Sequence, residues 1–111
     1  MLQFNTSRPQ ALLDALDKLI KDGDIATWAK DSDGDYTHKA AQWKSRAWMR
    51  PAVVAGSALQ FSILFSKNEA EPRLVYSYYH GHLLETFLNH LYGEFTRFEG
   101  SPSPSGRDSA I

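Results

Sequence analysis

The amino-acid sequence predicts an α+β domain in which two helices pack mainly on one face of an antiparallel sheet. Three observations favour this class: a helical apolar pattern early in the chain, a strictly alternating pattern in its centre, and a second helical pattern towards its end. The length of 111 residues suits one domain. We therefore expect a single domain over residues 1–99, ordered as N-terminal helix, three to five strands and C-terminal helix.

The first helix is predicted over residues 8–22. Its apolar residues recur three and four positions apart and therefore share one side of a helix: Leu12, Leu13, Leu16, Leu19 and Ile20. Pro9 suits a first turn, where no amide hydrogen is needed. Gly23 supplies the left-handed conformation that often ends a helix.

A hairpin is predicted next, with short strands over residues 25–30 and 36–39. The Asp- and Gly-rich segment 31–35 between them is typical of a turn. Residues 40–50 fit a helix or a strand, and we favour a strand because Arg50 precedes a proline, which disfavours helical backbone. Residues 51–58 are interpreted as a connection.

The clearest strand signal covers residues 59–65, where apolar side chains occupy every second position. A second strand is predicted over residues 73–79, which are rich in tyrosine. The connection between them is too short for a helical crossover, so we expect the two strands to pair antiparallel.

The second helix is predicted to begin near residues 80–82. Its apolar stripe consists of Leu84, Phe87, Leu88, Leu91 and Phe95. Residues 100–111 are rich in Ser, Pro and Gly. Because this tail has little apolar surface to offset the entropy of ordering it, we expect it to be disordered.

The predicted strand 73–79 carries large side chains on both faces. If both helices cover one face, the other exposes an apolar surface of the kind that marks an interface. This candidate interaction surface consists of Trp43, Trp48, Leu64, Tyr76, Tyr78 and Tyr79. The alternatives are one helix on each face, or tyrosines that keep only their hydroxyls in water. We expect a non-catalytic binding domain that forms a homodimer or binds another protein.

Charge is distributed unevenly along the chain: −3 over residues 1–35, +5 over residues 36–68 and −3 over residues 69–111. The basic part suggests nucleic-acid binding as an alternative function. Four basic residues of segment 39–50 could neutralise phosphates while Trp43 and Trp48 stack on bases: Lys39, Lys44, Arg46 and Arg50. Protection of a sheet edge, internal ion pairs and self-association explain the same pattern, and no nucleic-acid module motif is present, so nucleic acid is not favoured.

A metal-dependent enzyme is a weaker alternative, based on His80, His82 and Glu85. Their spacing matches no strong zinc pattern. The Asp31–Asp35 segment lacks the Gly and Glu that a calcium loop needs at its sixth and twelfth positions. Phosphate-binding loops, a nucleophile elbow and cysteines are also missing from the sequence. The sequence therefore predicts no catalytic residue, no cofactor and no metal.

The first residues contain neither a basic leader nor a long apolar run. No stretch approaches the ~20 apolar residues of a membrane-spanning helix. We expect a cytoplasmic protein without a membrane partner.

Overall fold

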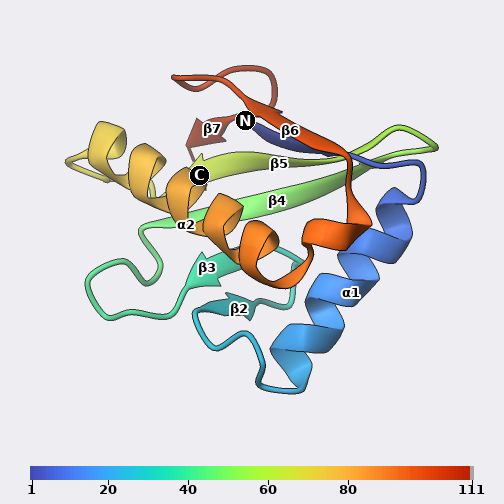
Figure 1. Cartoon of the computed structure of the whole chain (residues 1–111). Helices are drawn as coiled ribbons and strands as arrows, with labels where there is room; N and C mark the ends of the chain where they lie inside the picture. The colour runs from blue at the N-terminus through green and yellow to red at the C-terminus, as the bar shows by residue number, and fades with distance from the viewer. Residues whose placement is uncertain (111) are drawn as a thin grey trace.

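The computed structural model describes residues 1–110, which form a sheet with two α-helices and one 3-10 helix (Figure 1). The helices are α1 (Pro9–Lys21), α2 (Pro72–His90) and η1 (Tyr92–Glu94). The strands are β1 (Leu2–Asn5), β2 (Trp28–Lys30), β3 (Tyr36–His38), β4 (Ala47–Val54), β5 (Ala58–Phe65), β6 (Arg97–Gly100) and β7 (Ser109–Ala110). Within these residues no helix has the length and apolar character needed to cross a bilayer.

Six antiparallel strands form the sheet in the order β2-β3-β4-β5-β1-β6, and the short β7 runs parallel to the end of β5. The α+β class with an antiparallel sheet is therefore confirmed. Two details of the prediction are wrong: the sheet has six antiparallel strands instead of three to five, and a strand precedes the first helix. β1 is a central strand between β5 and β6.

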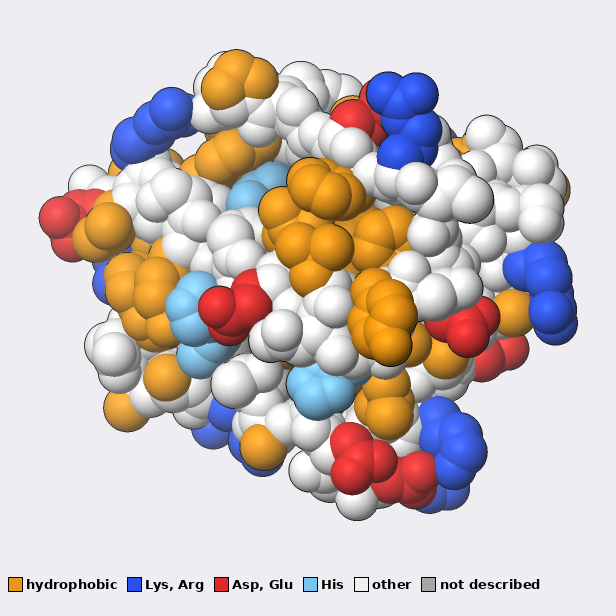
Figure 2. Space-filling model, in the orientation of Figure 1, with side chains coloured by type: hydrophobic (Ala, Val, Ile, Leu, Met, Phe, Trp, Pro, Cys, Tyr) orange, Lys and Arg blue, Asp and Glu red, His pale blue; other side chains and the backbone are white. Residues whose placement is uncertain are grey.

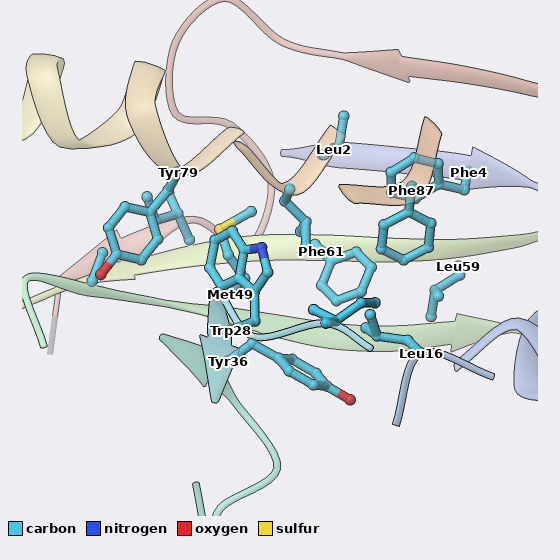
Figure 3. Close-up of a cluster of buried hydrophobic side chains, with 14 of the residues drawn as sticks. Leu2, Phe4, Leu16, Trp28, Tyr36, Met49, Leu59, Phe61, Tyr79 and Phe87 are labelled. Carbon is cyan, nitrogen blue, oxygen red and sulfur yellow. The ribbon is translucent and has the colours of Figure 1, made fainter. Parts of the chain in front are cut away.

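Both helices lie on the same face of the sheet. Phe4, Leu59 and Ile63 point to this face from β1 and β5, because Phe4 pairs with Leu59 in register and Ile63 lies four residues further along β5. The ring of Phe87 from α2 stacks on Phe4 with 3.9 Å between centroids. On α1, Asp17 accepts a hydrogen bond from Tyr36 of β3, which packs edge-on against Phe61. Figure 3 shows this core.

The first helix is confirmed with nearly the predicted bounds. Leu12 and Leu16 are fully buried against the sheet, as their spacing predicts. Gly23 follows the helix with a φ of 83°, in the left-handed region.

The predicted strand over residues 73–79 is wrong, because these residues form the first two turns of α2. Pro72 occupies the first turn, where its ring is tolerated. Val75, Tyr79, Leu83 and Phe87 are each four residues apart and all buried, so they form one continuous helical stripe. The expected pairing with residues 59–65 is also wrong: β5 pairs with β4, β1 and β7.

Residues 40–58 differ in part from the prediction. The favoured strand is present only from Ala47, while residues 41–45 form turns. β4 then continues through Pro51 to Val54, where a connection was predicted. Pro51 is tolerated because β3 pairs with β4 only at Met49, so the proline lies beyond the part of β4 that is flanked on both sides.

Residues 101–108 form a loop with a turn at Gly106, and β7 then lies beside β5. The carboxylate of Asp108 accepts a hydrogen bond from the Ile63 amide at 2.7 Å and one from the Ser105 amide at 2.8 Å. Tyr76 of α2 donates a hydrogen bond to the Ser101 carbonyl at 2.8 Å. The tail expected to be disordered, residues 100–111, therefore has several contacts over its described part, and Ile111 lies outside the described residues.

Candidate interaction surface

The six residues of the predicted interaction surface do not share one surface. Tyr76 and Tyr79 lie on the buried side of α2, inside the domain. Trp48 and Leu64 are cross-strand partners on the sheet face that carries no helix. Trp43 and Tyr78 form a stacked pair beside α2, with 3.7 Å between ring centroids. The structure thus brings together two pairs of the six and separates these pairs by the thickness of the sheet.

The Trp43–Tyr78 pair continues into a cluster of histidines. Tyr78 stacks on His82 with 4.0 Å between centroids, and His82 contacts His38 of β3. Because the Ala40 amide donates to Nδ1 of His38 at 3.1 Å, neutral His38 carries its proton on Nε2. It then donates this proton to Nδ1 of His82 at 3.3 Å. Sequence reasoning missed His38, because nothing in the sequence links it to a helix more than forty residues away.

Burial and the neighbouring His82 lower the pKa of His38. The rings of Trp28 and Tyr78 pack edge-on against it, and the side chain is almost completely removed from water. The arrangement therefore favours the neutral form of the His38 imidazole. The two histidines are suited to holding segment 40–45 against α2, because His38 accepts a hydrogen bond from the Ala40 amide and also bonds to His82 of α2.

The residues considered for metal binding lie on different sides of α2. His80 stacks on Tyr76 and bonds to the carbonyl of that residue, whereas His82 faces His38. Burial, with a further effect of the positive Met1 amino group, lowers the pKa of His80 to about 4. Glu85 is exposed. The three side chains do not converge.

One group of three carboxylates does converge within residues 1–110: Asp31, Asp33 and Asp35. Asp31 accepts hydrogen bonds from the amides of Asp33 and Asp35, both at 2.9 Å, as in a tight turn. Arg50 donates two hydrogen bonds to Asp35 and balances its charge. These contacts account for the cluster as a hairpin turn.

Two of the four basic residues considered for nucleic-acid binding are engaged in ion pairs. Arg50 pairs with Asp35, and Arg46 binds both oxygens of Glu69 at 2.8 and 2.7 Å. These bonds lower the pKa of Glu69 to about 2. Lys39 and Lys44 form no ion pair with any residue from 1 to 110. The guanidinium of Arg46 also lies over the Trp43 ring, 5.3 Å from its centroid, so less aromatic surface is free to stack on a base.

Three exposed apolar residues that sequence reasoning missed lie on elements at the β6 end of the sheet. Phe98, Leu88 and Tyr92 have 45%, 43% and 74% of their surface exposed, and they come from β6, α2 and η1. We call these three residues the β6 edge patch. Figure 2 shows hydrophobic side chains gathered in the middle of the face that carries α2 and β6. A strand of four residues after a helix gives too short a pattern to be recognised in the sequence.

The flank of α2 next to β6 carries one histidine followed by two leucines. His80, Leu84 and Leu88 follow each other at intervals of four and therefore form one row. His80 lies 3.2 Å from the Met1 amino group, at the start of β1, so this row faces the β1 and β6 side of the sheet. Phe98 pairs in register with Phe4 and points to the same side. The apolar side chains thus flank the outer strand.

Comparisons with models of protein families, with curated proteins and with solved structures found no match.

Proposed function

We propose that the protein is a non-catalytic binding domain that self-associates through its β6 end. The observation that carries this proposal is an edge strand, β6, whose outer side pairs with no other strand among residues 1–110, and which carries the exposed ring of Phe98. All four residues of β6 are exposed. An open sheet edge offers unpaired amide and carbonyl groups that pair readily with another strand.

The opposite edge of the sheet is less suited to this role. β2 has three residues, and the side chain of Trp28 is directed into the core, where its indole N–H bonds to Thr86. Lys30 beside it pairs with Asp17 of α1 at 2.8 Å. Self-association is therefore assigned to β6, where backbone groups and apolar side chains coincide.

The experiment is a measurement of mass by light scattering and sedimentation over a series of concentrations. We expect the mass to rise from one copy to two as the concentration increases. Replacing the exposed ring by Phe98→Thr, which keeps a strand-favouring residue, should shift this transition to higher concentration.

Leu74→Ser is the matched control, because Leu74 is exposed to the same extent, 45%, but lies near the start of α2. It should leave the transition unchanged. A single-copy mass at every concentration for the unmodified protein would contradict the proposal.

A further inference from the structure

We infer that the partner of β6 is the β6 strand of a second copy, paired antiparallel about a two-fold axis that passes through Phe98. This inference rests on the proposed self-association and adds its geometry. Three features of β6 support it: the direction of its free backbone groups, the separation of its side chains onto two faces, and the order of its charges.

The register with β1 determines which backbone groups of β6 point outward. The Ser101 amide donates to the carbonyl of Met1, its directly opposite residue, at 3.0 Å. In an antiparallel pair such bonded positions alternate with positions whose groups point away. The amide and carbonyl of Phe98 and Gly100 therefore face the open edge. Two copies of Phe98 placed opposite each other can exchange both of their backbone hydrogen bonds.

The side chains of β6 separate into an apolar side and a charged side. Phe98 points to the helix side, as its partner Phe4 does. Arg97 and Glu99 pair in register with Asn5 and Gln3 and point to the helix-free side. Neither of these two charges forms an ion pair within residues 1–110. A second copy could therefore meet an apolar contact on one side and unpaired charges on the other.

The order of the charges selects the register. With the axis at Phe98, Arg97 of each copy lies directly opposite Glu99 of the other, which gives two attractive pairs. An axis at Arg97 or at Glu99 would instead place two like charges opposite each other. Charged edge strands also keep sheets apart. A pair of opposite charges two residues apart, however, is complementary to its own antiparallel copy.

Four variants at the two charged positions test the register. Arg97→Glu alone places Glu against Glu99 of the other copy, and Glu99→Arg alone places Arg against Arg97. Each should raise the dissociation constant of the dimer about tenfold, because two symmetry-related pairs change from attraction to repulsion. The double variant R97E/E99R should associate as the unmodified protein does.

An equimolar mixture of the two single variants provides the sharpest test. Every 97–99 contact in a mixed dimer joins opposite charges, so mixing should restore the affinity that each variant loses alone. Lys67→Glu and Glu85→Arg are the controls for charge reversal at exposed positions outside β6, and they should not restore each other. Circular dichroism of each variant checks that the fold is retained.

The outcomes separate this inference from the proposed function. If Phe98→Thr weakens the dimer but charge reversal in β6 has no effect, the register is wrong and self-association through β6 stands. If the unmodified protein stays a single copy at every concentration, both are wrong. Weakening by each single variant, with recovery in the mixture, supports both.

Discussion

The hydrogen bond from Trp28 to Thr86 joins β2 to α2 inside the core. The indole N–H lies 3.0 Å from the threonine hydroxyl, and both side chains are buried. The Thr86 hydroxyl in turn donates a hydrogen bond to the carbonyl of His82 at 2.9 Å. The edge strand β2, which has only three residues, is thus attached to the longest helix through one side-chain hydrogen bond.

Replacing Thr86 by valine keeps the shape of the side chain but leaves the Trp28 N–H without an acceptor. We expect Thr86→Val to lower the free energy of unfolding by about 1–2 kcal/mol, the cost of a buried unsatisfied donor. Denaturant-induced unfolding measures the change. Thr27→Val, at an exposed position, should change the stability little; equal effects of the two variants would show that the hydrogen bond contributes nothing.

The His38–His82 pair makes stability depend on pH. The pKa of His38 is lowered in the folded protein, so the unfolded chain binds more protons once the pH falls below the ordinary value of about 6.5. The stabilisation is therefore complete above that pH and decreases below it, until the pH reaches the lowered pKa. Protonation of His38 also adds a hydrogen to Nδ1, which then faces the N–H of the Ala40 amide, so two donors are opposed.

Unfolding measured at about pH 7.5 and about pH 5 tests this prediction, since that interval spans the ordinary histidine pKa. The unmodified protein should lose more stability on acidification than His38→Gln, which cannot titrate at this position. His90→Gln, at an exposed position at the end of α2, is the control for loss of a histidine. An identical pH dependence in the unmodified protein and His38→Gln would contradict the prediction.

At the scale of elements, Gly81 and Gly56 differ in backbone conformation: Gly81 is helical, whereas Gly56 has a positive φ. Gly81 lies inside α2 on its exposed side, and an added Cβ would meet no atom within 4 Å. Gly56 turns the β4–β5 hairpin with a φ of 69°, a conformation that other residues adopt only with strain. The same substitution should therefore have opposite effects on the two elements.

We expect Gly81→Ala to raise the free energy of unfolding by about 0.5–1 kcal/mol, because alanine favours a helix over the unfolded chain. Gly56→Ala should lower it by about 1 kcal/mol, because of left-handed backbone strain. Thermal or denaturant unfolding of the two variants side by side measures both. A stabilising Gly56→Ala would show that this hairpin can relax its turn.

The outcome for α2 shows what could be predicted from the sequence and what could not. Alternating tyrosines over residues 73–79 favour a strand locally, yet the spacing of four from Val75 to Phe87 continues across the predicted boundary at residue 80. That longer pattern decides the structure, because it buries one continuous stripe. α1 was predictable because its local pattern and its burial agree.

The candidate site depended on information that a local pattern does not contain. Trp48 and Leu64 were singled out as apolar, but their position opposite each other follows from the β4–β5 register. Tyr79 was expected on a surface and is buried, because the strand that was to expose it is a helix. The β6 edge patch combines side chains from three elements, so only the assembled sheet reveals it.

At the scale of the whole molecule, the last described residues complete the sheet beside β5. Asp108 supplies the acceptor for the Ile63 amide, and its side chain is fully buried. This hydrogen bond joins two residues that are 45 positions apart in the sequence. It lies beyond the first residue of β1, where β7 instead of β1 pairs with β5.

We expect the Ile63 amide to exchange its hydrogen slowly, and Asp108→Ala to accelerate this exchange about ten- to a hundredfold, because a bond to a charged acceptor is lost. Amide hydrogen exchange followed by NMR measures this at a single site. Arg107→Ala, which changes the exposed neighbouring residue, is the control. Rapid exchange at Ile63 in the unmodified protein would favour the disordered tail that composition predicts.

The central place of β1 affects how the chain folds as it is synthesised. This strand is made early, but its two neighbours, β5 and β6, begin at residues 58 and 97. While the ribosome is still producing α2, one side of β1 has no partner strand. The ring of Phe4 then also lacks the rings of Phe87 and Phe95, on which it packs in the folded protein. Nascent chains should therefore become compact late and in a single step. Until then they expose hydrophobic surface and an unpaired strand edge, to which chaperones can bind.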